Sequence, residues 1–275
     1  MFKWKTGVGA ALAAVFTGIA SSAMALPVNY EMGFQAPASD IMAKIESFHQ
    51  LLVVIIVAIC IFVLGLLVWI VLRYRAGANP VASKTHHNTL LEVAWTIIPV
   101  IILVLIAIPS FRLLYEEAAI PQADVTIKAI GKQWFWTYQY PGSGDFQFDS
   151  LGLSDADAAK AGKPRLLGVD NAIYVPVNKN IVIETAGSDV IHSWALPQMG
   201  VKMDAVPGRT NRTWFRANET GIFYGQCSEL CGARHAYMPI EVHVVTDAEY
   251  KAWLATAKTK YATLDTPDAT RVAAK

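Results

Sequence analysis

Two long apolar runs without a charged residue constrain the fold of this chain more than any other feature of its sequence. They cover residues 51–72 and 93–111. A helix rises about 1.5 Å per residue, so each run is long enough to cross the roughly 30 Å hydrocarbon core of a membrane. Pro99 and Pro109 interrupt the second run, which membrane helices tolerate better than soluble helices do. The sequence therefore predicts two transmembrane helices.

The composition agrees with a protein that is partly embedded in a membrane. Hydrophobic residues make up 54% of the chain and charged residues only 16%, against about 25% charged residues in soluble domains. This balance excludes a wholly soluble protein and a disordered one. The net charge of +1 gives no support for nucleic-acid binding, and three cysteines are too few for a disulfide scaffold.

A shorter apolar run lies at the N-terminus, over residues 7–25, and ends in the tripeptide A-M-A. Two lysines precede it, and the run is rich in Ala and Gly. This pattern is typical of a secretory signal peptide, so we predict a signal over residues 1–25 and an external N-terminal segment over 26–47. The alternative is an uncleaved first transmembrane helix.

The connection between the two long runs carries basic residues and no acid. These residues are Arg73, Arg75, Lys84, His86 and His87. By the positive-inside rule the connection lies in the cytoplasm, and both flanking ends lie outside. The signal peptide independently predicts an external N-terminus. We therefore predict a helical hairpin over residues 48–114, with spans of about 48–72 and 90–112.

Residues 115–247 are predicted to form one external, β-rich domain. Short alternating or β-branched segments, separated by Gly, Pro, Asn and Asp, are typical of an all-β sandwich or barrel. Residues 152–164 resemble a surface loop, and 248–275 are predicted to form a C-terminal helix and a tail. The predicted strands are 125–130, 134–140, 172–177, 181–185, 213–217, 221–225 and 240–245.

The segment between the last two predicted strands carries the richest chemistry. It contains two thiols, an imidazole and a thioether, at Cys227, Cys231, His235 and Met238. Thiolate and thioether favour copper, and imidazole suits it too, whereas Mg²⁺ and Ca²⁺ prefer oxygen ligands. A Cys, His and Met on one loop, with a His upstream, is typical of blue-copper electron carriers. His192 offers the upstream imidazole, and the second cysteine lets two thiolates bridge two copper ions.

Three alternatives remain open at this point. Cys227 and Cys231 could form a disulfide, because the domain is external, although a disulfide leaves the histidine and the methionine unexplained. Zinc is possible, but methionine is a poor zinc ligand. His192, taken alone, would more often be a buried, hydrogen-bonded histidine than a metal ligand.

At these residues the sequence resembles subunit II of haem-copper cytochrome c oxidases of the proteobacterial and mitochondrial type. The resemblance covers roughly residues 40–255 and is most specific in the copper loop and the aromatic segment. It implies a two-helix transmembrane hairpin followed by an all-β, cupredoxin-like Greek-key domain. The matching segments are 92–99 (EVAWTIIP), 108–111 (IPSF), 131–140 (GKQWFWTYQY), 189–197 (DVIHSWALP), 204–209 (DAVPGR) and 225–239 (GQCSELCGARHAYMP).

The resemblance implies a dinuclear copper centre, CuA, in the external domain. By the family pattern, Cys227 and Cys231 bridge the two copper ions. His192 and Met238 complete the coordination of one copper. His235 completes that of the other, together with a backbone carbonyl.

Glu229 is the source of that carbonyl in the family pattern, and its side chain would bind a magnesium ion shared with subunit I. The chain has no C-x-x-C-H motif, so we expect no haem in it. The oxygen-reducing site would belong to subunit I, with haem a, haem a3 and a further copper, CuB.

The aromatic segment allows two interpretations. Trp134, Trp136, Tyr138 and Tyr140 alternate along a predicted strand, which an ordinary sandwich core explains. The resemblance implies instead that Trp134 lies at the surface and receives electrons from cytochrome c. It also implies an acidic docking face, whose alternative is a solvated surface. The acids that match this face are Asp145, Asp170 and Asp189.

Glu92 lies at the cytoplasmic edge of the second span. A carboxylate there can simply stabilise the positive end of the helix dipole. The resemblance implies a second role, at the mouth of the K pathway, through which protons enter subunit I.

The resemblance as a whole implies a subunit of a proton-pumping oxidase in a bacterial inner membrane, with its copper domain in the periplasm. Its partners would be subunits I and III, cytochrome c and membrane lipid, with no nucleic acid. A quinol oxidase subunit II would lack the copper ligands, and nitrous oxide reductase is a longer, soluble enzyme. A membrane-anchored copper chaperone would have one span and a thioredoxin-like fold.

Overall fold

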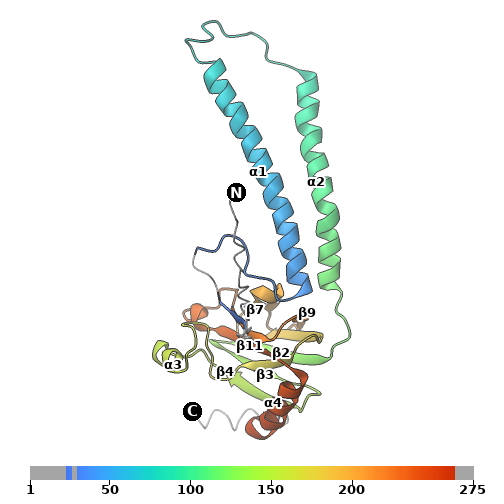
Figure 1. The fold of residues 1–275 in the computed structure, drawn as a ribbon, viewed down its shortest axis with the longest axis vertical. Coiled ribbons are helices and arrows are strands. Elements are labelled where there is room, and N and C mark those ends of the chain that lie inside the picture. The colour runs from blue at the N-terminus through green and yellow to red at the C-terminus, as the bar shows by residue number, and fades with distance from the viewer. Residues whose placement is uncertain (1–22, 27–29, 264–275) are drawn as a thin grey trace, which may run out of the picture.

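The computed structural model describes residues 23–26 and 30–263, in which two long helices rise from one side of a β domain (Figure 1). The helices are α1 (Asp40–Arg73) and α2 (Thr89–Ala118). Both are long and apolar enough to cross a membrane, with a mean hydropathy of 3.6 in α1 and 2.7 in α2 over an apolar stretch of 18 residues. The predicted pair of transmembrane helices is therefore confirmed.

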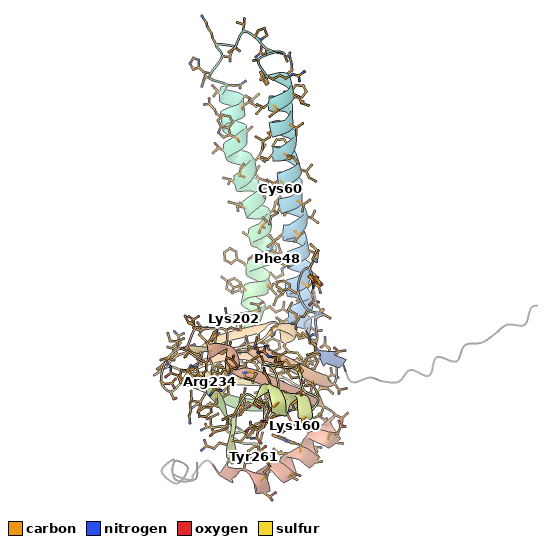
Figure 2. The ribbon with its side chains drawn as sticks, turned by 90° about the vertical axis from the view of Figure 1, so that its left-hand side faces the viewer. Phe48, Cys60, Lys160, Lys202, Arg234 and Tyr261 are labelled. Carbon is orange, nitrogen blue, oxygen red and sulfur yellow. The ribbon has the colours of Figure 1, made fainter. Side chains whose placement is uncertain are left out.

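The apolar surface of this hairpin is almost entirely exposed. None of the α2 residues is buried, and in α1 only Ile41 and Met42 are buried. Figure 2 shows Phe48 in the part of the hairpin nearer the β domain and Cys60 farther along it, well away from that domain. Such a surface is stable only against lipid or against helices of another chain.

Both helices extend beyond the predicted hairpin boundaries, because their ends attach to the β domain. Ser39 caps α1, accepting a hydrogen bond from Met42 N, and its hydroxyl donates to Met199 O at 2.9 Å. Trp214 Nε1 donates to Glu117 O at 3.2 Å, near the end of α2. The hairpin is thus fixed to the domain at both of its ends.

The β domain contains two sheets and a two-stranded ribbon. The first sheet has the order β1-β10-β11-β5, and the second has the order β12-β4-β3-β2-β6-β9. The first sheet consists of β1 (Ala23–Ala25), β5 (Ile173–Pro176), β10 (Gly221–Gln226) and β11 (Pro239–Val245). The second consists of β2 (Val125–Lys132), β3 (Phe135–Gln139), β4 (Phe146–Ser150), β6 (Ile181–Gly187), β9 (Asn211–Phe215) and β12 (Ala262–Thr263). The ribbon is β7 (His192–Leu196) with β8 (Val201–Ala205).

One hydrophobic core receives side chains from both sheets and from the ribbon. Its largest fully buried side chains include Trp136, Tyr138, Tyr140, Trp194, Phe215 and Phe223. The core interpretation of the aromatic segment is therefore correct for the three aromatic residues from position 136 onward. Trp134 lies just before β3, is partly buried and packs against the edge of the core.

Five strands and a short helix lie outside the sequence predictions, and two of the five are the short edge strands β1 and β12. β7 is buried at all five positions, so it shows no alternation, and β8 pairs with it. β4 alternates but is only five residues long. The helix α3 (Asp155–Lys160), capped by Ser154, lies inside the segment predicted as a loop. The predicted C-terminal helix is confirmed as α4 (Asp247–Lys260), with a capping box between Thr246 and Glu249.

The predicted signal peptide falls mostly on residues 1–22, outside the described part of the chain, as does the tail over 264–275. The last three residues of the predicted signal peptide form β1, which pairs in parallel with β10 from Gly221 to Phe223. Cleavage after Ala25 would remove this edge strand and leave the β10–β11 pair intact. The cleavage site stays a prediction.

A buried carboxylate ties the segment around α3 to β11. The Glu241 side chain is fully buried and contacts Lys163 Nζ at 3.0 Å and His243 Nε2 at 2.7 Å. It also accepts a hydrogen bond from Val169 N at 3.0 Å. Burial alone would raise the pKa of Glu241, but these three partners outweigh it and hold the pKa below its ordinary value.

Candidate metal centre

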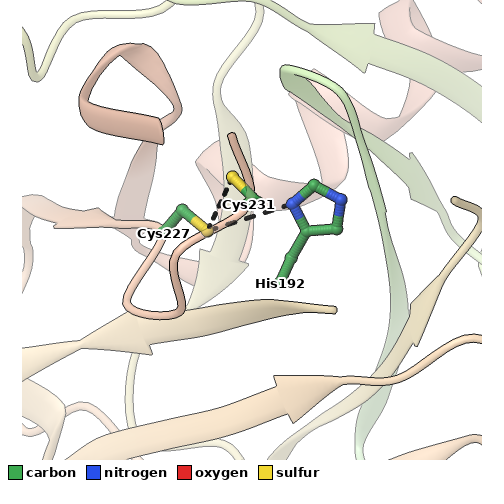
Figure 3. Close-up of side chains that lie close together, drawn as sticks. All are labelled: His192, Cys227 and Cys231. Carbon is green, nitrogen blue, oxygen red and sulfur yellow. Dashed lines mark hydrogen bonds between the residues drawn. The ribbon is translucent and has the colours of Figure 1, made fainter. Parts of the chain in front are cut away.

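Three soft ligands meet at the end of the ribbon. The ligand atoms of His192, Cys227 and Cys231 all lie within 4.8 Å of one another (Figure 3). All three side chains are buried. Cys227 Sγ is 4.0 Å from His192 Nδ1 and 3.8 Å from Cys231 Sγ. A disulfide needs about 2.05 Å between sulfurs, so the two thiols are free here and the disulfide alternative is wrong for this structure.

The other predicted ligands lie in the same place. His235 Nδ1 is 3.6 Å from Cys231 Sγ, and the backbone carbonyl of Glu229 is 3.4 Å from Cys227 Sγ. Met238 is buried, and its carbonyl accepts a hydrogen bond from Cys227 N at 3.0 Å. The fold thus brings together all six residues that the sequence singled out as ligands.

The loop that carries five of these residues is closed at its base by a strand ladder. β10 ends and β11 begins with the paired residues Gln226 and Pro239, so Cys227 and Met238 start and end the loop side by side. Ser228 N donates to Ser193 O at 3.0 Å, which attaches the loop to β7. His192 is the first residue of β7 and therefore faces the loop.

Two glycines make room for the site. A Cβ on Gly131, in β2, would lie 2.6 Å from His192 Cδ2, so only glycine lets the imidazole lie against this strand. Gly232 has a φ of +121°, and its Cβ would lie 3.1 Å from both Gln133 Nε2 and Trp134 Cζ2. Glycine is needed at 232 for its conformation and for the close approach of residues 133 and 134.

A carboxylate orients the buried imidazole. Asp189 Oδ1 lies 2.8 Å from His192 Nε2, on the side of the ring opposite to Cys227. When Nε2–H donates to this carboxylate, the lone pair of Nδ1 is directed at the sulfurs, as a metal ligand requires. The sequence placed Asp189 in a docking face and gave no sign of this contact.

The two thiols differ in acidity. Burial alone would raise the pKa of Cys227, but the hydrogen bond with His192 and further hydrogen bonds outweigh it and lower the pKa to about 6. Burial, reinforced by the adjacent Cys227 sulfur, raises the pKa of Cys231 to about 12. Because the two sulfurs lie 3.8 Å apart, the first thiolate opposes loss of the second proton until a bound cation offsets its charge.

The donor set fits copper. Two thiolates and a thioether are soft ligands, and imidazole completes a set that copper favours over Mg²⁺ or Ca²⁺. The buried Met238 weighs against zinc, which takes Cys, His and carboxylate ligands. Glu229 is exposed, and the group that lies at the sulfurs is its backbone carbonyl.

Trp134 touches the metal loop directly. Its Nε1 donates a hydrogen bond to the carbonyl of Cys231 at 3.2 Å, and the side chain is partly buried. This places a partly buried aromatic ring against the backbone of Cys231, one of the candidate ligands.

The three predicted docking acids lie at different places. Asp189 is beside Trp134, since its Oδ2 accepts from Gln133 N at 2.7 Å. Asp170 accepts from Leu151 N at 2.8 Å, just beyond the end of β4 that pairs with Trp136. Asp145 lies in the turn between β3 and β4, at the opposite end of β3 from Trp134.

Asp149 is an acid that the sequence analysis did not select. It pairs with Thr137 across β3 and β4 and accepts a hydrogen bond from the Thr137 hydroxyl at 2.7 Å. Strand residues are about 3.4 Å apart, so Thr137 lies roughly 10 Å along the strand from Trp134. Asp149 is therefore closer to Trp134 than Asp145 is.

Glu92 lies in the first turn of α2 and contacts a histidine. Its Oε1 is 2.8 Å from His87 Nδ1 and accepts a long hydrogen bond from Asn88 N at 3.4 Å. The Glu92 carboxylate thus lies at the start of α2 and accepts from its N-cap residue, as expected of a group that stabilises the helix start. The sequence gives no sign of the pair with His87, because it forms only when the loop folds back onto the helix.

Comparison with known proteins covers both parts of the chain. Residues 125–245 match the family model "Cytochrome C oxidase subunit II, periplasmic domain". Residues 27–113 match the model "Cytochrome C oxidase subunit II, transmembrane domain". The two matches divide at the junction between α2 and the β domain.

Individual relatives agree with the family models. The probable cytochrome c oxidase subunit 2 of Rickettsia bellii is 50% identical over 229 residues, 83% of this chain and 85% of its own. Cytochrome c oxidase subunit 2 of Cereibacter sphaeroides is 45% identical over 243 residues, 82% of this chain and 80% of its own. The crystal structure of the periplasmic domain of subunit II of Bradyrhizobium japonicum cytochrome oxidase is 58% identical. It covers 52% of this chain and 100% of its own, with a TM-score of 0.49. The identities to the Rickettsia and Cereibacter proteins, over most of both chains, show that the chain belongs to the cytochrome c oxidase subunit II family.

Proposed function

We propose that this chain accepts electrons from cytochrome c at a dinuclear CuA centre and delivers them to haem a of subunit I. There O2 is reduced to water and protons are pumped. The observation that carries the proposal is the buried cluster of His192, Cys227 and Cys231, with His235 and the Glu229 carbonyl beside the two sulfurs. Four soft side chains, two thiols, an imidazole and a thioether, lie within a twelve-residue loop opposite a second imidazole.

Cys227 and Cys231 would bridge two copper ions. Their sulfurs lie 3.8 Å apart without being bonded, so both can contribute to the same pair of metals. His192 and Met238 would complete one copper, and His235 would complete the other with the Glu229 carbonyl. A copper pair bridged in this way supplies one-electron transfer with little rearrangement of its ligands.

Electrons would enter at Trp134. Its indole N–H bonds to the carbonyl of Cys231, so a short path of covalent bonds leads from the ring contact to the Cys231 sulfur. The ring is partly buried, which leaves an edge for a docked haem protein. Trp134 therefore combines access from outside with contact to a ligand residue.

Acidic side chains around Trp134 would steer a basic cytochrome c. Complementary charge speeds association more than it adds affinity. Asp189 and Asp170 lie at the Trp134 end of the domain, and strand register favours Asp149 over Asp145 as the third acid. We propose that these three acids are the centre of the docking face.

Two further roles depend on subunit I. The exposed carboxylate of Glu229 would bind magnesium at the contact between the two subunits. Glu92, with His87 beside it, would deliver protons to the K pathway from the cytoplasmic side. The basic connection between the two helices supports that orientation, in which the copper domain would lie in the periplasm.

The exposed hairpin is the surface on which subunit I, subunit III and lipid would pack. Two apolar helices with almost no buried residue need such neighbours. The membrane-spanning part would then fix the copper domain over subunit I, since both helix ends are hydrogen-bonded to the domain.

Metal analysis of the full chain, purified in detergent and loaded with copper, tests the proposal. We expect two coppers per chain and the colour and spin signal of a mixed-valence pair. One weakly bound, colourless Cu(I) would favour a copper chaperone instead, and tightly bound zinc would contradict the ligand assignment.

A further inference from the structure

We infer that Gln133 is a positioning residue of the copper centre, holding one cysteine and one histidine ligand through two separate hydrogen bonds. The inference rests on the proposed copper function. It concerns the residue before Trp134, which the sequence analysis passed over.

The side chain of Gln133 fixes the cysteine. Its Nε2 donates to the carbonyl of Cys231 at 2.8 Å, and the same carbonyl accepts from Trp134 Nε1 at 3.2 Å. A carbonyl oxygen has two lone pairs, so these two donors satisfy it fully. The backbone of Cys231 is therefore held from one side by adjacent residues, 133 and 134.

The backbone of Gln133 fixes the histidine through an intermediate. Its N–H donates to Asp189 Oδ2 at 2.7 Å, while Asp189 Oδ1 lies 2.8 Å from His192 Nε2. Val190 N also donates to Oδ1 at 2.7 Å. The carboxylate thus has no freedom to rotate away, and the imidazole keeps Nδ1 directed at the sulfurs.

The contact between Gln133 and Cys231 leaves no room for a side chain at the next residue of the loop. Gly232 follows the clamped carbonyl, and any side chain there would meet Gln133 Nε2 at 3.1 Å. The contacts join parts of the chain that are 98 and 56 residues apart in sequence. One dipeptide therefore presents the ring that receives electrons and holds ligands from two different segments.

The contact to Cys231 separates Gln133 from an ordinary surface glutamine. Gln139 lies at the other end of the adjoining strand β3, and its side chain hydrogen-bonds to Gln147 at 2.9 Å. Gln133 is exposed and Gln139 is partly buried, and it is the Gln133 side chain that donates to Cys231 in the ligand loop. Gln139→Ala is therefore a matched control for Gln133→Ala.

The test compares Gln133→Ala, Gln133→Glu and Gln139→Ala in the full chain. Gln133→Glu keeps the length of the side chain and the backbone N–H but replaces the donor by an acceptor. Outer contacts of this kind change metal affinity about 10–100-fold when removed. We expect both Gln133 variants to bind copper at least about tenfold more weakly in competition with a Cu(I) chelator, with an altered spin signal from any bound pair. Gln139→Ala should match the wild type.

A second measurement uses the metal-free chain. Hydrogen exchange of the loop over residues 228–237 should speed up in the Gln133 variants and stay unchanged in Gln139→Ala. Unchanged exchange together with unchanged copper affinity and spin signal would overturn the inference. If Gln133→Ala does not fold, the exchange rate, copper affinity and spin signal of Gln133→Glu decide whether the inference stands. Faster exchange in a chain whose wild type binds no copper would support the positioning role and refute the proposed function.

Discussion

Replacing Gly131 by alanine tests whether β2 sets the position of His192. The new Cβ would lie 2.6 Å from Cδ2 and 2.7 Å from Cγ of the imidazole. An ordinary carbon–carbon contact is about 3.5 Å, so the ring would have to retreat by about 0.9 Å. His192 is fully buried, and its far side is bonded to Asp189, so the ring cannot retreat freely.

The size of that shift predicts the effect. Metal–ligand distances hold to within about 0.2 Å, so a retreat of this size removes His192 from the correct position. Overpacking a buried site also costs about 1–3 kcal/mol of stability. We expect Gly131→Ala to fold with a lower melting temperature, to bind fewer than two coppers per chain, and to lose the mixed-valence spin signal.

Gly77→Ala is the matched control. Gly77 lies in the loop between α1 and α2, and a Cβ there has nothing within 4 Å. It should leave copper content, spin signal and melting temperature at wild-type values. A Gly131→Ala chain with full copper content and an unchanged spectrum would refute the view that β2 positions His192.

Three further substitutions test separate parts of the molecule. Trp134→Phe removes the N–H bonded to Cys231 O and should slow electron uptake from cytochrome c, measured by stopped flow, with the copper spectrum nearly intact; an unchanged rate would exclude Trp134 as the acceptor. Glu241→Gln removes a buried charge bonded to Lys163 and His243 and should cost about 1–3 kcal/mol at neutral pH. Because the folded pKa of Glu241 is depressed, its contribution to stability is present above the unfolded pKa and disappears as the pH falls through the folded pKa. The melting temperatures of wild type and variant should therefore converge in acid. A difference in melting temperature that stays constant with pH would contradict this. Glu92→Gln should impair proton uptake by the assembled oxidase without affecting copper reduction, and unaltered turnover across pH would leave Glu92 with its helix-start role alone.

The sequence predicts the hairpin well, because a transmembrane helix depends on a local property. An uncharged run of sufficient length has few other solutions. The same runs underestimate the helices, since α1 begins at Asp40, where attachment to the β domain extends it. That attachment uses Ser39 and Met199, a contact between residues far apart in the chain.

The ligand loop is also predictable, since its thiols, imidazole and thioether are close in sequence. The structure adds the groups that hold those ligands. Asp189 and Gln133 contact His192 and Cys231, and neither contact follows from residue type or spacing. Likewise β7 escapes prediction, because a strand buried on both faces shows no alternation. Patterns in sequence thus select the candidate ligands, whereas the folded sheets determine which groups orient them.

The most direct test of the central proposal is the number and electronic state of coppers in the full chain. Wild-type protein should bind two coppers and give the spin pattern of one unpaired electron shared equally by two nuclei. Cys227→Ser, which removes a thiolate at the centre of the cluster, should abolish that pattern. A wild-type chain with a single copper, or with the spin pattern of one copper nucleus, would contradict the proposed dinuclear centre.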